Sequence, residues 1–249
     1  MIDPAPPDGF ERIVAGRCSV TVRSANADDA RALLAEGTPY EAAARDLAAR
    51  PLEGRGVSYA ITLPASGDSV VVRRNRHGGL LATMTGTLFV PPSRAPYELS
   101  VSRRLANAGV RTPAVVMYAL ERVHGLFCHA DVITSEIADS RDLSAYMLSG
   151  VPTRDRMAAW SAARDLLATL NAAGARHHDL NVKNILLAPR GSGLTAWVLD
   201  VDRVVFGEPG SESVRKGNAK RLLRSALKWR ALRGASFSEE DASLLDRVS

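Results

Sequence analysis

The residues whose types and spacing could do chemistry lie between His177 and Asn184. The stretch His177-His178-Asp179-Leu180-Asn181-Val182-Lys183-Asn184 has the form H-x-D-L-x-x-x-N and leads into an apolar run. Phosphoryl transfer to a hydroxyl needs an Asp that accepts the hydrogen bond of that hydroxyl and an Asn on the same loop that ligates Mg²⁺. We therefore predict that Asp179 is the catalytic residue and that Asn184 is a metal ligand.

A second carboxylate, Asp200, ends an apolar stretch downstream of this loop. A hairpin between the two segments would bring Asp200 across from Asn184, where it would be the second Mg²⁺ ligand. Taken alone, Asp179 could instead cap a helix or turn, with Asn184 satisfying backbone groups. The kinase interpretation is favoured because the loop pattern and the strand-terminal Asp occur together.

Two arginines end a β-branched run upstream, Val70-Val71-Val72-Arg73-Arg74. Strand alternation sends Arg73 and Arg74 to opposite faces, so only one of them can reach a nucleotide. We predict that Arg73 binds the phosphates of ATP and that Glu98, on the following helix, orients it through an ion pair. The alternatives are a solvated strand end for Arg73 and a surface carboxylate for Glu98.

Gly54 and Gly56 precede the first strand of this region. Glycines let the backbone approach phosphate oxygens closely, which predicts a nucleotide contact at both positions. An ordinary turn is the alternative for so short a pattern.

The elements that must position these residues follow from turn, cap and periodicity signals. We expect residues 1–16 to be a loose lead-in, and Thr38-Pro39-Tyr40-Glu41 to begin a helix with a capping box that runs to about Arg50. The further strands are expected at 57–63, 70–74, 114–119, 127–135, 184–187 and 195–199, and the further helices at 96–108, 142–148, 153–173 and 213–232.

This order of elements predicts an α+β, two-lobed, protein-kinase-like fold with a small β-rich N-lobe and a helical C-lobe. We assign residues 1–50 to an N-terminal extension with a helix, 51–137 to the N-lobe and 138–249 to the C-lobe.

The composition of the chain bears on its binding partners and on its location in the cell. The chain has 249 residues, a formal charge of +5 and only 5 % aromatic residues. Because no stretch interleaves aromatics with Lys or Arg, nucleic acid is not expected as a partner. There is no apolar run long enough for a membrane span and no signal peptide, and Cys18 and Cys128 lack metal-ligand spacing, so we expect a cytoplasmic protein.

Several stretches resemble the lipopolysaccharide core sugar kinases, in particular the 3-deoxy-D-manno-octulosonic acid (Kdo) kinases. They are Val72-Arg73-Arg74-Asn75-Arg76-His77-Gly78-Gly79-Leu80, the Glu98 helix, Val132-Ile133-Thr134, His178 to Leu186, and Leu199-Asp200-Val201-Asp202-Arg203. The resemblance covers roughly residues 50–230. It implies a minimal protein-kinase fold with Arg in place of the strand Lys, Asp-x-Asp-Arg in place of Asp-Phe-Gly, and no long activation segment.

The resemblance implies transfer of the γ-phosphate of ATP, with Mg²⁺, to a Kdo hydroxyl on a lipid A precursor. For this anionic acceptor we expect contacts from Arg74, Arg76 and His77, although a solvated turn is the alternative. The last helix carries many Lys and Arg residues beside leucines, so it could touch the cytoplasmic face of the inner membrane or simply pack on the C-lobe. Two rival functions stay open: another small-molecule phosphotransferase, such as an aminoglycoside kinase, and a nucleotide-binding pseudokinase scaffold.

Overall fold

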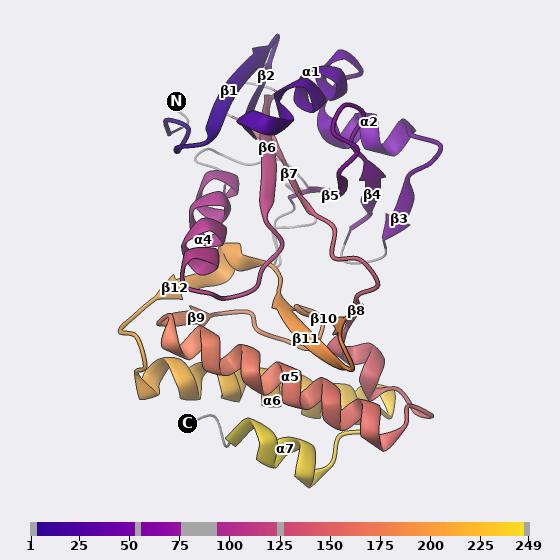
Figure 1. Cartoon of the computed structure of the whole chain (residues 1–249), viewed down its shortest axis with the longest axis vertical. Helices are drawn as coiled ribbons and strands as arrows, with labels where there is room; N and C mark the ends of the chain where they lie inside the picture. Colours follow the sequence, from indigo (N-terminus) through magenta and orange to yellow (C-terminus); the bar gives the residue numbers. More distant parts are fainter. Residues whose placement is uncertain (1–3, 53–55, 76–93, 124–126, 247–249) are drawn as a thin grey trace. The chain divides into compact units, whose positions relative to one another are not determined.

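The computed structural model describes residues 4–52, 56–75, 94–123 and 127–246 (Figure 1). The chain forms two compact units. The N-terminal unit comprises Met1–Ser100 and Ala114–Glu136, and the C-terminal unit comprises Val101–Pro113 and Ile137–Ser249. The stretch 101–113 thus belongs with the C-terminal unit, although it lies between two stretches of the N-terminal unit in the sequence.

The N-terminal unit is built on an antiparallel sheet. Its strands, in the order in which they lie across the sheet, are β1 (Phe10–Ala15), β2 (Cys18–Arg23), β6 (Val115–Arg122), β7 (Cys128–Ser135), β5 (Ser69–Arg74), β4 (Ser58–Thr62) and β3 (Arg50–Leu52). The helical elements of this part of the chain are η1 (Ser24–Asn26), α1 (Ala27–Ala35), α2 (Pro39–Arg45) and α4 (Ala95–Asn107), the last of which continues into the C-terminal unit.

Strand alternation sorts the apolar residues of this sheet onto two faces. Val70 and Val72 of β5 are fully buried in a cluster with residues of α1 and α2. Val132 of β7 packs in a separate cluster with Ala95 and Leu99 of α4. Helices α1 and α2 therefore cover one face of the sheet and the start of α4 covers the other, as the period of two in a strand requires.

The helix start predicted at Thr38 is confirmed. Thr38 accepts a hydrogen bond from the backbone of Glu41, whose side chain accepts one from the Thr38 backbone, which together make the capping box. The helix ends at Arg45 and not near Arg50. The predicted hairpin of β4 and β5 is confirmed as well, with Thr62 paired to Ser69 across its turn.

The expectation of a loose lead-in over residues 1–16 is wrong. Phe10–Ala15 is strand β1, which pairs along its whole length with β2. Residues 1–50, predicted as an N-terminal extension, thus contribute two strands to the same sheet as β5. The sequence signal for a strand is weak here because Phe10–Ala15 is an edge strand without strict alternation of apolar and polar residues. Its pairing with β2, and not its own pattern, makes this segment a strand.

The C-terminal unit combines helices with small sheets. Its elements are β8 (Arg141–Asp142), η2 (Leu143–Met147), α5 (Thr153–Ala172), β9 (Ala175–His177), β10 (Ile185–Arg190), β11 (Gly193–Val198), η3 (Val201–Arg203), β12 (Val204–Phe206), α6 (Glu212–Arg233) and α7 (Glu239–Asp246). Strand β10 pairs with β11 and β8, and β12 pairs with β9. Helix α5 and the β10–β11 hairpin share one apolar core with buried residues of α6.

The predicted long helices and hairpin of this unit are confirmed within a few residues, and the short helix predicted at 142–148 is the 3₁₀ helix η2. Gly174 ends α5 as expected, with a positive φ of 65°. A Cβ there would lie 2.4 Å from the carbonyl oxygen of Gly207, and the Gly207 N–H donates to the Gly174 carbonyl at 2.8 Å. Only glycine allows this contact, which fixes the chain after β12 against the end of α5.

Candidate active site

Arg73 lies near the end of β5, on the sheet face covered by α4. Its guanidinium forms an ion pair with Glu98 and donates to the Asn75 side chain at 2.8 Å. Glu98 is buried in the first turn of α4, so its direction is set by the helix. The predicted ion pair is therefore present, and it gives the half-buried Arg73 a defined direction.

Arg74 points to the opposite face, as strand alternation predicts. Its guanidinium forms a bidentate ion pair with the buried Asp131 of β7 at 2.7 and 3.2 Å, donates to Thr38 at 2.8 Å and stacks on the Tyr40 ring at 4.8 Å. Burial raises the pKa of Asp131, while the adjacent guanidinium lowers it. These contacts lock β5, β7 and the start of α2 together, which is a structural role that the sequence alone did not indicate.

The catalytic-loop pattern folds around one backbone carbonyl. The side-chain amides of Asn181 and Asn184 both donate to the carbonyl of Asp179, each at 2.9 Å, and Asn181 accepts from the backbone of Lys183. The backbone N–H of Leu199 donates to the Asn184 carbonyl at 2.9 Å, which joins the loop to the end of β11. The loop and the segment of Asp200 are thus adjacent, as the predicted hairpin requires.

His177 is buried below the loop and acts as a bridge. Its Nδ1 accepts from the backbone of Asp179 at 3.1 Å, and its Nε2 therefore carries the hydrogen that is donated to the Leu199 carbonyl at 2.9 Å. Burial lowers the pKa of His177, against the raising effect of that hydrogen bond and of the nearby acidic residues. The ring is consequently neutral, and this role was not assigned from the sequence.

Asp200 stands at a backbone position that few residues adopt. Its φ of 53° and ψ of 45° lie in the left-handed region, which costs an L residue about 1–2 kcal/mol. The residue is exposed, and its carboxylate makes no hydrogen bond or ion pair with any of the described residues. An outlying backbone angle at an exposed carboxylate is typical of a functional position.

Asn184 and Asp200 have the chemistry that Mg²⁺ prefers. Because the Asn184 amide nitrogen donates to Asp179, its oxygen is the atom left for a ligand, and Asp200 adds a carboxylate. Within the described part of the chain no cluster of three or more His, Cys, Asp or Glu residues could hold a metal by itself. Two protein oxygens fit a cation that takes its other ligands from phosphates and water.

Two anchors of the loop lie outside the motif. Lys183 forms an ion pair with Asp142 at 2.9 Å and lies over the Trp229 ring at 5.5 Å. The buried Asn218 of α6 accepts from the backbone of His177 and donates to the Ala175 carbonyl, both at 2.9 Å. A single Asn within the buried stripe of α6 is the signal that could have pointed to this contact.

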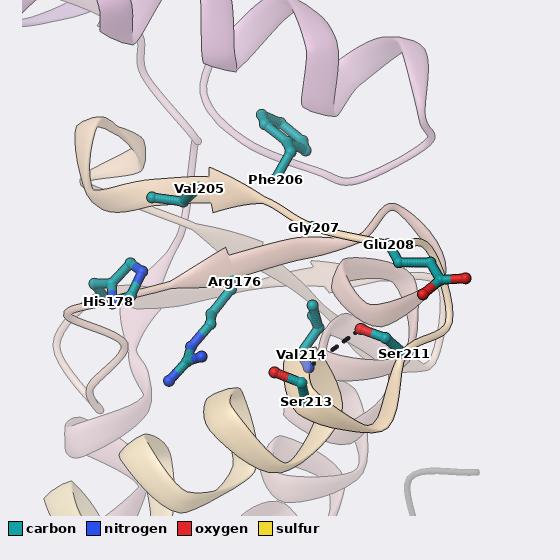
Figure 2. Close-up of a pocket in the computed structure, with 9 residues that line it drawn as sticks. All are labelled: Arg176, His178, Val205, Phe206, Gly207, Glu208, Ser211, Ser213 and Val214. Carbon is teal, nitrogen blue, oxygen red and sulfur yellow. Dashed lines mark hydrogen bonds between the residues drawn. The ribbon is translucent and has the colours of Figure 1, made fainter.

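A pocket of about 380 Å³ opens beside the loop in the C-terminal unit (Figure 2). It lies at the paired strands β9 and β12 and at the start of α6, where Ser211 caps the helix by accepting from the Val214 backbone at 3.5 Å. The lining residues are Arg176, His178, Val205, Phe206, Gly207, Glu208, Ser211, Ser213 and Val214. The sequence did not indicate this pocket.

The remaining predicted site residues divide into two groups. Gly56 is described and lies just before β4 in the N-terminal unit. Gly54, Arg76 and His77 lie outside the described residues.

Comparisons with known proteins identify the family of this chain. A model of the lipopolysaccharide kinase (Kdo/WaaP) family matches residues 50–247. The 3-deoxy-D-manno-octulosonic acid kinase of Stenotrophomonas maltophilia (strain K279a) is 31 % identical over 208 residues, which cover 80 % of this chain and 78 % of the relative. The kinase of the same name from Pasteurella multocida (strain Pm70) is 28 % identical over 194 residues, 76 % and 79 % of the two chains.

A solved structure shares the fold. It is described as WaaP in complex with acyl carrier protein, and it is 20 % identical with a TM-score of 0.52, covering 87 % of this chain and 84 % of that one. The predicted α+β, protein-kinase-like fold is confirmed by this match.

Proposed function

The chain belongs to the lipopolysaccharide kinase (Kdo/WaaP) family and is a sugar kinase, and we propose that it transfers the γ-phosphate of ATP to a hydroxyl of Kdo on a lipid A precursor. The observation that carries the proposal is the loop in which Asp179, Asn184 and the Asp200 segment are joined by hydrogen bonds. The acceptor is taken from the names of the relatives, which span most of this chain.

Asp179 is the proposed catalytic residue. Its carboxylate accepts the hydrogen bond of the acceptor hydroxyl and takes the proton as transfer proceeds. A bond forms between the hydroxyl oxygen and the γ-phosphorus, the bond from that phosphorus to the bridging oxygen breaks, and ADP leaves. The loop contributes by holding the hydroxyl in line, and its hydrogen bonds through Asn181, Asn184 and His177 support that role.

Asn184 and Asp200 would hold Mg²⁺. When bound, the ion would neutralise negative charge that develops on the phosphates. The free carboxylate of Asp200 and the orientation of the Asn184 amide support this assignment.

Arg73 is the proposed phosphate contact of the N-terminal unit, steadied by Glu98, with Gly54 and Gly56 close to the phosphates. The proposed acceptor contacts are Arg76 and His77. Arg74 is better explained as a structural residue, because its guanidinium is engaged by Asp131, Thr38 and Tyr40.

The test is a turnover assay with the full chain, ATP, Mg²⁺ and a Kdo-containing lipid A precursor, with the phosphorylated acceptor identified by mass spectrometry. We expect one phosphate per acceptor, dependent on Mg²⁺ and lost in Asp179→Ala. An aminoglycoside serves as the control acceptor and should not react. Nucleotide binding without turnover on any acceptor would favour a pseudokinase scaffold, and turnover only on the aminoglycoside would favour the rival phosphotransferase.

We also propose that α6 rests on an anionic membrane surface. No helix of the described residues is long and apolar enough to cross a membrane. One side of α6 is buried, with Leu222 and Ala226 in the core. Another side is exposed and carries Lys216, Lys220, Arg224 and Lys228 at intervals of four residues, followed by the exposed Leu232. A basic face with apolar residues at one end suits the surface of anionic lipids.

Vesicle co-sedimentation tests this contact. We expect binding to anionic vesicles that weakens with salt, little binding to neutral vesicles, and loss of binding in Lys220→Glu combined with Arg224→Glu. Equal binding of this variant and the wild type would contradict the proposal.

A further inference from the structure

The pocket beside the catalytic loop lies within reach of the reacting hydroxyl. In strand β9 the exposed Arg176 lies between the buried residues Ala175 and His177, and the exposed His178 follows the strand. Arg176 and His178 both line the pocket. Asp179 follows His178 directly. Because β9 ends at His177 and the next two residues form a turn, the backbone distance from Arg176 to Asp179 is at most about 10 Å. An arginine side chain covers part of that distance, so one sugar can touch both Arg176 and Asp179.

The Arg176 side chain is held in place by the helix below it. A Cβ at Gly217 of α6 would lie 2.9 Å from Nε and 3.2 Å from Cζ of Arg176, so the guanidinium rests against the glycine. Within the described part of the chain it forms no ion pair or hydrogen bond. An arginine that is positioned but not neutralised is suited to an anionic group of a ligand.

The other residues that line the pocket leave the Arg176 guanidinium accessible to a ligand. Figure 2 shows the Glu208 carboxylate pointing away from Arg176. The Phe206 ring stacks on Arg104 at 3.7 Å and does not fill the pocket. The wall at Gly207 is fixed by the backbone contact with Gly174, so the pocket is formed before a ligand arrives.

We infer that this pocket is the subsite for the acceptor sugar and that Arg176 binds the carboxylate of that sugar. The inference rests on the proposed function, because it takes the acceptor to be a sugar acid. Two anionic groups could come from this acceptor, the carboxylate of the sugar and a phosphate of the lipid A part. The carboxylate is favoured because it belongs to the same sugar as the hydroxyl that Asp179 must reach.

The first experiment is steady-state kinetics with Kdo-lipid A precursor on the wild type, Arg176→Ala and the control Arg190→Ala. Arg190 is an exposed arginine at the β10–β11 turn that does not line the pocket. We expect Arg176→Ala to raise the KM for the acceptor about 10- to 100-fold, with kcat, the KM for ATP and the melting temperature nearly unchanged. Arg190→Ala should behave like the wild type.

Gly217→Ala gives an independent test that keeps the charge. The added methyl group must displace the Arg176 guanidinium, whereas an alanine within a helix favours folding. We expect a raised KM for the acceptor together with an equal or higher melting temperature, a combination that loss of stability cannot produce. An unchanged KM in both Arg176→Ala and Gly217→Ala would overturn the inference.

A direct binding experiment distinguishes failure of the sugar subsite from failure of the proposed kinase function. The methyl glycoside of Kdo and its carboxyl-reduced analogue are titrated into the wild type and Arg176→Ala, with binding followed by NMR. We expect the wild type to prefer the intact glycoside and Arg176→Ala to bind both equally weakly. An effect of Arg176→Ala on the lipid-linked acceptor alone would assign the anion to a lipid A phosphate and overturn the carboxylate contact. If the wild type binds the glycoside in this way but does not phosphorylate Kdo-lipid A, the proposed function fails and the subsite stands.

Discussion

In the N-terminal unit the two arginines at the end of β5 are held by ion pairs, whereas in the C-terminal unit the backbone of Asp179 is held by neutral hydrogen bonds. Glu98 orients Arg73 and Asp131 binds Arg74. In the loop, the backbone of Asp179 is held by hydrogen bonds with the amides of Asn181 and Asn184 and with the ring of His177.

The difference follows from what each group must do. A guanidinium keeps several donors after one carboxylate has bound it, so an ion pair can aim Arg73 and still leave it able to bind phosphate. A carboxylate that is needed for a cation cannot be neutralised in the same way. Asp200 accordingly lies in a strained backbone position with no ion pair to a described residue, and the backbone around Asp179 is held by groups without charge.

The largest effect is expected at Asp200, whose carboxylate is proposed to stay without an ion pair so that it can bind Mg²⁺. Asp200→Asn removes the charge of a proposed Mg²⁺ ligand, so we expect kcat to fall by about 10³-fold or more. Stability should not fall, because the carboxylate holds no described partner. The measurement combines kinetics over a range of Mg²⁺ concentration with urea unfolding. Retention of more than about a tenth of the wild-type kcat would count against the metal role.

Asp179 gives the next largest effect. Asp179→Ala should lower kcat by roughly 10²–10⁴-fold, the range for loss of a positioned general base. ATP affinity, measured by calorimetry, should barely change, because other residues are proposed to hold the nucleotide. If Asp179 were only a cap, the variant would instead lose about 1 kcal/mol of stability and keep its turnover per folded molecule.

Arg73 and Arg74, which are neighbours in β5, are expected to differ in the effect of their removal. Arg73→Ala should raise the KM for ATP of the folded fraction about 10- to 100-fold, and because it also removes the ion-pair partner of the buried Glu98, stability should fall as well. Arg74→Ala leaves the buried Asp131 unpaired, so its free energy of unfolding should fall by about 3–5 kcal/mol while the KM for ATP of the folded fraction is unchanged. Arg74→Lys, which keeps the charge, is the control that should recover part of the stability. The reverse assignment of the two effects would contradict the observed strand register.

The smallest expected effect is the pH dependence that His177 introduces. Burial lowers the pKa of His177 in the folded protein, so the unfolded chain binds the proton more readily. Stability should therefore fall as the pH drops below about 6.5, by at most about 1.4 kcal/mol per pH unit from this residue.

His177→Gln removes this titration and should flatten that part of the curve of unfolding free energy against pH. The exposed His178→Gln is the matched control for the loss of an imidazole next to the loop. Equal slopes for His177→Gln and the wild type would show that the loop is not held by a neutral ring.

The local pattern determined much of this fold. The capping box at Thr38, the hairpin of β4 and β5, and the long helices α5 and α6 were predictable because each depends on residues that are neighbours along the chain. The same holds for the H-x-D-L-x-x-x-N loop, whose asparagine side chains bond to backbone groups two to five residues away. It also holds for the opposite directions of Arg73 and Arg74, which follow from the period of a strand.

Long-range contacts decided the rest. Strand β1 has no strong pattern of its own and is a strand because β2 lies beside it. Arg74 looked like a ligand contact until Asp131, 57 residues later in the chain, was found against it. His177 and Asn218 gained their roles in the same way, from partners on other elements, and the Arg176 pocket exists only because β9, β12 and α6 meet. A sequence pattern reports periodicity and local spacing, whereas the partner of a buried polar group is chosen by the tertiary fold.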